Sequence, residues 1–280
     1  MSHDQELVGH FEEYVTSWLN QFPADHRALK ELWNSMKYSL SGGGKRTRPV
    51  LGLRVAEALD TPRHYVLPWL TAIEIIHAYS LIHDDLPCMD NDDFRRGRPT
   101  NHKVHGEACA LLAGDALQCE AFGLIAASYA KDSERGLRLV LLLAEAAGFR
   151  GMVGGQSIDF LSKIEDLSEN ELLALHGMKT GALFRVTCEG VALISGKSSA
   201  TIEDFRAYGT SIGLCFQLAD DLLDSAEHIE KGSLPARIGL AKTRERLNSE
   251  CESALTHLKR AGIQSGPLVE LVHWNQTRKV

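Results

Sequence analysis

Long stretches rich in alanine, leucine and glutamate make up most of this sequence, and they restrict the chain to one class of fold. Only 8 of the 280 residues are proline, and few runs alternate apolar with polar residues, which is the pattern of helices rather than strands. We identify no convincing strand and expect helices at about 5–20, 26–40, 49–59, 64–86, 106–128, 133–151, 168–194, 201–226 and 235–261. The sequence therefore predicts an all-α protein, a large helical bundle in which residues 1–280 form a single domain.

The composition argues against several classes of protein. The net charge of −7 argues against a nucleic-acid surface, because a phosphate backbone needs clustered basic residues. The N-terminus lacks the basic and apolar stretches of a signal peptide. No uninterrupted apolar run approaches the ~20 residues of a membrane span. We therefore expect a cytoplasmic protein with no membrane span and no nucleic-acid partner.

One predicted helix carries four polar residues on a single stripe. Gln217, Asp220, Asp221 and Asp224 stand at positions i, i+3, i+4 and i+7 of a largely apolar segment. A solvated face is the simple explanation of such a stripe, but the apolar residues on the other faces of this helix indicate burial. Three buried carboxylates on one face repel one another unless cations neutralise them. Oxygen ligands at this spacing suit Mg²⁺.

A second apolar helix also ends in carboxylates. His77 and Asp84 are seven residues apart, so they share one helix face, about 10 Å apart along the axis. Asp90 would point elsewhere on a straight helix, but Pro87 ends or kinks the helix and lets Asp90 return toward Asp84 and Asp85. A helix end followed by an acidic turn is the structural alternative. Because acid at a helix C-terminus opposes the helix dipole, a bound cation is the better explanation.

Basic residues gather at 45–48 and 95–98, close in sequence to the first of these acidic segments. Such clusters of mixed sign suit a small polyanionic ligand that is held through metal ions. The glycine-rich segment 42–45 is not a P-loop, because Arg46 follows Lys45 where Ser or Thr belongs.

The two acidic motifs resemble the paired DDxxxxD and DDxxD signatures of the trans-prenyl diphosphate synthases, in particular the bacterial farnesyl diphosphate synthase type of the polyprenyl synthetase family. They read DDLPCMD at 84–90 and DDLLD at 220–224. Further motifs are similar to that family in order and spacing: GGKRTRP at 43–49, HAYSLIHDDLP at 77–87, RRG at 95–97, GGQ at 154–156, KTGAL at 179–183 and FQ at 216–217. The resemblance covers residues 5–260 and implies a single-domain helical bundle around a central cavity, the isoprenoid synthase fold.

The resemblance also implies a role for individual residues. The metal ligands would be Asp84, Asp85, Asp90, Asp220, Asp221 and Asp224, which together would hold three Mg²⁺ per active site, with Mn²⁺ as the alternative metal. The allylic diphosphate would be bound by Arg95, Lys179 and Lys231, and isopentenyl diphosphate by Lys45, Arg48, His77 and Arg96. The dipoles of Lys179, Thr180 and Gln217 would face the reacting carbon atoms.

The implied reaction joins isopentenyl diphosphate to dimethylallyl diphosphate or geranyl diphosphate and gives mainly farnesyl diphosphate. Charge on the departing diphosphate is stabilised, a carbocation forms, and the isopentenyl double bond attacks it before a proton is lost. Tyr79, five residues before Asp84, would form the floor under the growing chain, and Ser80 would lie beside it. The resemblance also implies a homodimer.

One segment departs from the family pattern. Relatives usually carry a glycine-rich loop with another lysine after the second aspartate motif, whereas here Lys231 and Pro235 follow Asp224 after a short segment. Either the chain has lost this loop or the sequence omits a mobile segment. The tail 275–280 still offers basic groups to the diphosphates.

Other functions stay open within this fold. A geranyl or geranylgeranyl diphosphate synthase would differ only in product length. A terpene cyclase or a squalene-type synthase needs no isopentenyl diphosphate site, so Lys45, Arg48, His77 and Arg96 argue against both. A non-catalytic partner subunit commonly loses aspartates, whereas this chain keeps both motifs.

Overall fold

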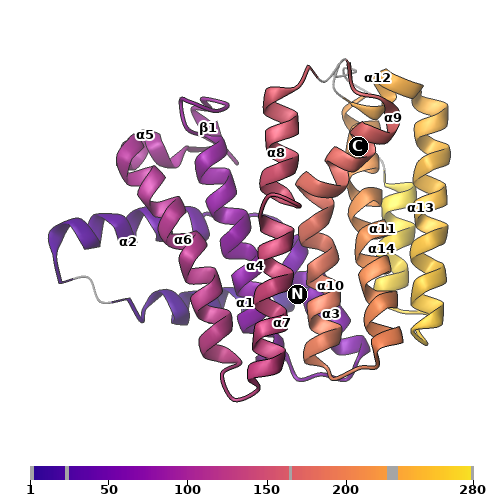
Figure 1. The fold of residues 1–280 in the computed structure, drawn as a ribbon, viewed down its shortest axis with the longest axis horizontal. Coiled ribbons are helices and arrows are strands. Elements are labelled where there is room, and N and C mark those ends of the chain that lie inside the picture. The colour runs from indigo at the N-terminus through magenta and orange to yellow at the C-terminus, as the bar shows by residue number, and fades with distance from the viewer. Residues whose placement is uncertain (1–2, 23–24, 164–165, 226–232, 279–280) are drawn as a thin grey trace. The chain divides into compact units, whose positions relative to one another are not determined.

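The computed structural model describes residues 3–22, 25–163, 166–225 and 233–278 (Figure 1). The chain divides into two compact units. Unit 1 comprises Met1–Leu53 and Arg63–Val140, and unit 2 comprises Arg54–Pro62 and Leu141–Val280. The expectation of an all-α protein is confirmed, whereas that of one domain over residues 1–280 stays a prediction.

Unit 1 contains α1 His3–Leu19, α2 Arg27–Leu40, α4 Arg63–Asp84, β1 Phe94–Arg95, β2 Arg98–Pro99, α5 Asn101–His105 and α6 Glu107–Ser128. Unit 2 contains α8 Met152–Leu161, α9 Glu169–His176, the π-helix η2 Gly177–Gly181, α10 Ala182–Ile194, α11 Ser199–Asp224, α12 Leu234–Ile238, α13 Leu240–Arg260 and α14 Pro267–Thr277. Two helices, α3 Thr47–Ala58 and α7 Ser133–Ala147, contribute residues to both units.

The core of unit 1 is built around α4, which packs most extensively against α6. Trp69, Leu70 and Ile73 on α4 are fully buried. A helix that is apolar on every side is expected in the interior, where its whole surface is removed from water. Burial of α4 fixes the positions of His77 and Asp84 on its last two turns.

Two helices of unit 1, α4 and α6, are long and apolar enough to span a membrane by length and composition alone. The sequence analysis did not identify either helix as a possible membrane span, because Glu74 interrupts the apolar run of the first and Asp115 that of the second. Buried residues make up 72% of the apolar window in α4 and 39% of that in α6. α4 is therefore accounted for as a core helix, whereas α6 leaves Leu111 and Leu112 exposed.

The core of unit 2 is built around α10 and α11. Cys188 and Val191 of α10 and Phe205 and Ile212 of α11 are buried, and α13 covers another side of α11. The Ser198 side chain caps the N-terminus of α11. The helix runs without interruption to Asp224, so it carries the second aspartate motif on its last two turns.

The expectation of no strand was wrong, because β1 and β2 form a short antiparallel hairpin in which Arg95 pairs with Arg98. Arg96 and Gly97, with φ of 53° and 73°, form its turn. Positive φ at both central residues is typical of two-residue hairpin turns. Strands of two residues contain no alternation to detect. The helices α5, α8 and α14 were also not separately expected, and the helix expected at 168–194 is divided by η2.

Candidate active site

The first aspartate motif begins where α4 ends. The chain turns back after Asp84, and the Asp90 N–H donates a hydrogen bond to the Asp84 carbonyl oxygen at 2.9 Å. This contact confirms the expected return of Asp90 after Pro87. Asp84 is partly exposed and Asp90 is exposed, so both carboxylates are accessible to a ligand from solvent.

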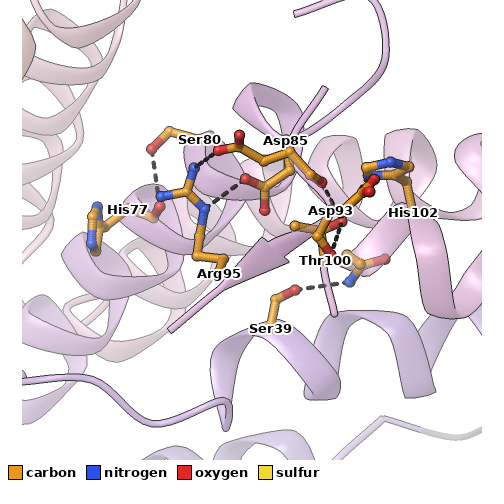
Figure 2. Close-up of polar contacts among 10 residues, drawn as sticks. Ser39, His77, Ser80, Asp85, Asp93, Arg95, Thr100 and His102 are labelled. Carbon is orange, nitrogen blue, oxygen red and sulfur yellow. Dashed lines mark hydrogen bonds and ion pairs between the residues drawn. The ribbon is translucent and has the colours of Figure 1, made fainter. Parts of the chain in front are cut away.

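Asp85 differs from its neighbours because its side chain is buried and paired. The carboxylate is only 5% exposed and accepts a hydrogen bond from Arg95 Nε at 2.6 Å. Figure 2 shows Arg95 reaching Asp85, and Arg95 also pairs with Asp92 at 3.3 Å. Burial raises the pKa of Asp85, although Arg95 opposes that effect. Asp85 is thus a less available metal ligand than Asp84.

A pocket in unit 1 has more basic than acidic side chains in its lining. Its acidic and basic lining residues are Arg46, Glu74, His77, Asp85, Arg95, Arg96 and Arg98. Burial lowers the pKa of His77 well below its ordinary value, and the charges of Arg48 and Arg96 lower it further. The imidazole is therefore neutral at pH 7, in a surrounding that favours an anion.

The glycine-rich loop before α3 is held by the β-hairpin. Arg96 Nη1 donates a hydrogen bond to the Gly43 carbonyl oxygen at 2.7 Å. A Cβ atom at Gly44 would lie 2.4 Å from the same Nη1, and the φ of 131° at this position favours glycine. Lys45 follows on the exposed side of the loop, and Arg48 is less exposed. The structure thus brings Arg48, Arg96 and His77 together and leaves Lys45 at the solvent.

Arg46 anchors this loop from inside and is not available to a substrate. The residue is 4% exposed. Its guanidinium donates to Glu12 at 2.6 Å, to Glu74 at 2.8 Å and to the Leu40 carbonyl oxygen at 2.6 Å. Burial acts to lower the pKa of Arg46, but the charge of Glu74 and the hydrogen bond to Glu12 outweigh burial and raise it.

In unit 2, Lys179 and Thr180 lie in the π-helix η2. A π-helical turn is rare and frequently marks a functional site. Lys179 Nζ forms an ion pair with Asp159 of α8. The backbone of η2 approaches α8 so closely that a Cβ atom at Gly155 would lie 2.5 Å from the Lys179 nitrogen. The structure thus explains why glycine stands in the GGQ motif.

Hydrogen bonds connect η2 to the second aspartate motif. The Thr180 hydroxyl donates to Gln217 Oε1 at 3.1 Å, and Gln217 Nε2 donates to Asp221 Oδ1 at 2.9 Å. The other oxygen of Asp221 accepts from the Leu234 N–H at 3.2 Å. Asp221 is buried, so its carboxylate is occupied on both sides within the chain.

Asp220 and Asp224 are more accessible than Asp221. The Asp220 side chain is 37% exposed and pairs with Arg278 at 2.8 Å, and Asp224 is exposed. In both motifs the second aspartate is therefore buried and engaged, while the first and the last keep contact with solvent.

These residues fit magnesium as an ion shared with a bound diphosphate. Within the described ranges, no three His, Cys, Asp or Glu side chains lie close enough to hold a metal ion by themselves. Mg²⁺ usually takes only one or two carboxylates and completes its shell with water and substrate phosphates. The accessible carboxylates that meet this requirement are Asp84, Asp90, Asp220 and Asp224.

The two residues expected to set chain length lie on α4. Tyr79 is buried, and its ring meets the edge of His83 with centroids 5.7 Å apart. Burial raises the pKa of the Tyr79 hydroxyl, and a hydrogen bond with Gln118 opposes that effect. The Ser80 hydroxyl donates to the His77 carbonyl oxygen at 3.0 Å (Figure 2). Lys231, expected to bind the allylic diphosphate, lies outside the described residues.

Three residues near the site were not expected from the sequence. Arg46 belongs to the basic cluster at 45–48, and the sequence alone does not distinguish its structural role from the roles of the other basic residues there. Asp159 follows the GGQ motif by only three residues, but nothing in the sequence pairs it with Lys179. Arg278 lies in the basic tail, which was the one signal that pointed to it.

Comparisons with known proteins agree with this geometry. The sequence model of the polyprenyl synthetase family matches residues 29–233. The chain is 42% identical over 282 aligned residues to a farnesyl diphosphate synthase of Geobacillus stearothermophilus, with 94% of each chain covered. It is 41% identical to a farnesyl diphosphate synthase of Micrococcus luteus, with 87% of each covered. Among solved structures, an FPP/GFPP synthase from Zymomonas mobilis has a TM-score of 0.86 and 36% identity, covering 97% of this chain and 98% of that one. This chain therefore belongs to the polyprenyl synthetase family.

Proposed function

We propose that this protein is a farnesyl diphosphate synthase, which joins isopentenyl diphosphate to dimethylallyl diphosphate or geranyl diphosphate. The observation that carries the proposal is the presence of two aspartate motifs together with a basic pocket around His77, which Asp85 of the first motif and Arg95 also line. An enzyme that only ionises an allylic diphosphate needs the motifs but not the pocket. The farnesyl diphosphate synthases of Geobacillus stearothermophilus and Micrococcus luteus support the C15 product.

The accessible carboxylates are the proposed magnesium ligands. Asp84 and Asp90 in unit 1, and Asp220 and Asp224 in unit 2, would be the ligands of three Mg²⁺ ions, or of Mn²⁺ in their place. Bound magnesium supplies positive charge that stabilises the departing diphosphate. The buried second aspartate of each motif acts through its partners: Asp85 positions Arg95, and Asp221 positions Gln217.

Cationic side chains assist the departure of the allylic diphosphate. Lys179 binds a diphosphate oxygen directly, and the ion pair with Asp159 holds its ammonium group before substrate arrives. Arg95 offers a planar guanidinium, which recognises phosphate oxygens through two hydrogen bonds. Lys231 adds a further charge.

Thr180 and Gln217 stabilise the positive charge that develops on the allylic carbon. Because Thr180 donates to Gln217 Oε1 and Gln217 Nε2 donates to Asp221, the amide of Gln217 is fixed in one orientation. Its oxygen and the Thr180 hydroxyl oxygen provide preorganised dipoles with their negative ends available to a cation. Bulk water must be kept away from that cation, which water would otherwise trap.

The basic pocket binds isopentenyl diphosphate without a metal ion. Arg48 and Arg96 bind its phosphates through charge-assisted hydrogen bonds, and Lys45 adds charge from the exposed loop. His77 is neutral before binding, so one ring nitrogen is a donor and the other an acceptor. Tyr79, buried one to two turns before Asp84, limits the product to C15, and Ser80 lies at the same depth.

The proposed enzyme is cytoplasmic and forms a homodimer. The support for a dimer is the exposure of large apolar side chains on two helices: Leu111 and Leu112 on α6 are 46% and 56% exposed, and Leu137 on α7 is 61% exposed. A second copy of the chain would remove this surface from water. Light scattering of the purified protein would then give twice 30.8 kDa, and a single chain mass would contradict the dimer.

The test is incubation of the purified protein with Mg²⁺, isopentenyl diphosphate and either dimethylallyl or geranyl diphosphate, followed by chromatography of the products. A main product of C15 from both allylic substrates is expected. A main product of C10 or C20 would assign a geranyl or geranylgeranyl diphosphate synthase. No condensation from either substrate would favour a non-catalytic subunit, and cyclic hydrocarbons would favour a cyclase.

A further inference from the structure

The guanidinium of Arg278 is held by several contacts at the second aspartate motif. Arg278 follows the end of α14, where its N–H donates to the Trp274 carbonyl oxygen at 2.8 Å. Its Nη2 donates to Asp220 Oδ1 at 2.8 Å and to the Phe216 carbonyl oxygen at 2.7 Å. Both contacts lie within unit 2. The arginine thus joins the end of α14 to the aspartate-bearing end of α11.

This contact differs from an ordinary surface ion pair. The Arg278 side chain is only 6% exposed. Its guanidinium lies 4.8 Å from the centroid of the Phe216 ring and 4.9 Å from that of Trp274. Aromatic faces attract a guanidinium and remove it from water, which strengthens its attraction to a carboxylate. Asp220 therefore already has a cation in this structure.

The hydrogen bonding of the Arg278 guanidinium is nevertheless incomplete within the described residues. Its buried Nε–H has no hydrogen-bond partner within the described residues. A buried donor without a partner costs free energy. The guanidinium recovers that cost when it leaves the site, so its net loss of free energy is small when a competitor binds Asp220. A magnesium ion at Asp220 is such a competitor, because it needs the carboxylate oxygen to which Arg278 Nη2 now donates.

We propose that Arg278 is an exchangeable counter-ion, which neutralises Asp220 in the substrate-free protein and leaves it when a divalent cation binds. This inference rests on the proposed role of Asp220 as a metal ligand. Asp221 needs no such exchange, because Gln217 Nε2 and the Leu234 N–H each donate a hydrogen bond to its carboxylate. The consequence is that the free enzyme binds a divalent cation weakly at this motif. The guanidinium prevents the carboxylates of α11 from repelling one another until the substrate brings its metal.

The test measures Mn²⁺ binding to the full-length, substrate-free protein by electron paramagnetic resonance, without any turnover. Arg278→Gln is expected to bind Mn²⁺ about tenfold more tightly than wild type, because one competing ion pair is gone. Arg278→Lys keeps the charge and is expected to stay near the wild-type affinity. Arg244→Gln is the matched control, since Arg244 is exposed and donates a hydrogen bond to the Gln276 carbonyl oxygen of the same tail, at 3.5 Å. That control is expected to shift the affinity less than twofold.

Two further results decide between the inference and the function on which it rests. Asp220→Asn must weaken Mn²⁺ binding, and equal binding by Asp220→Asn and wild type would overturn the proposed metal site itself. If Asp220→Asn binds weakly but Arg278→Gln binds like wild type or more weakly, the exchange is wrong while the metal site stands. Far-UV circular dichroism confirms that each variant is folded. If Arg278→Gln does not fold, Trp274→Leu, which removes one of the two rings against the guanidinium, must tighten Mn²⁺ binding instead.

Discussion

Replacing Arg46 with methionine should destabilise the protein strongly although it removes no proposed substrate contact. The guanidinium of Arg46 is 2% exposed and pairs with Glu74, whose side chain is 5% exposed. Arg46→Met therefore leaves the Glu74 carboxylate buried without its closest cation. It also removes the hydrogen bond that fixes the Leu40 carbonyl oxygen.

The size of the effect follows from these contacts. Breaking a buried ion pair by removing one partner costs about 3–5 kcal/mol. Here the charges of Arg48 and Arg96 still act on Glu74, so we expect the lower end, about 3 kcal/mol. In a chain of this size each kcal/mol lowers the melting temperature by about 2 °C, which gives a fall of about 6 °C.

The assay is thermal unfolding followed by circular dichroism, with two companion variants. The double variant Arg46→Met, Glu74→Met should recover most of the loss, because an apolar pair replaces the ionic one. Arg98→Met is the matched control: Arg98 is exposed and stacks on Tyr38 at 4.2 Å, so it should cost less than about 1 kcal/mol. Melting of Arg46→Met within 1–2 °C of wild type, or a double variant that melts lower still, would refute the reasoning.

Three other predictions concern the site. The pKa of His77 in the folded protein lies below its unfolded value near 6.5, so the contribution of His77 to stability is present above pH 6.5 and is lost as the pH falls. Between pH 6.5 and 5.5, the free energy of unfolding measured in urea should fall by about 1 kcal/mol more for wild type than for His77→Gln. Equal losses in the two proteins would contradict this prediction. Asp159→Asn should raise the KM of the allylic diphosphate about tenfold by freeing Lys179, with rescue by Asp159→Glu; an unchanged KM would show that the ion pair does not position the lysine. Tyr79→Ala should shift products to C20 or longer and Ser80→Phe toward C10, as read by chromatography, and an active Tyr79→Ala that still stops at C15 would place the floor elsewhere.

The parts of this molecule that depend on local periodicity were predictable from the sequence. Apolar residues at helical spacing predict α4 and α11, and the position of Pro87 predicts the turn that returns Asp90 to Asp84. Such features need only the geometry of one helix and the restriction that proline imposes. The bounds of α4 and α11 were accordingly expected to within two residues, and both aspartate motifs were found, without knowledge of tertiary contacts.

The parts that depend on long-range partners were not predictable. Arg46 and Arg48 are two residues apart and have the same chemistry, and nothing in the sequence indicates that Arg46 pairs with carboxylates from two other helices. Likewise Asp84 and Asp85 are adjacent, and nothing in the sequence indicates that Asp85 is buried and paired with Arg95 of the hairpin. The π-helix η2 arises where its backbone packs against Gly155 of α8, a contact between segments far apart in the chain. No single-sequence pattern distinguishes these cases.

The central claim is that the accessible aspartates hold the metal that drives ionisation of the allylic diphosphate. The most direct measurement is the turnover number of purified Asp84→Ala and Asp220→Ala with Mg²⁺, isopentenyl diphosphate and geranyl diphosphate, all at saturation, with folding checked by circular dichroism. Loss of this stabilisation should cost at least ~3–4 kcal/mol, or about 10²–10³-fold in turnover. We therefore predict a fall of at least that size in each variant, and a near-normal rate in either folded variant would contradict the claim.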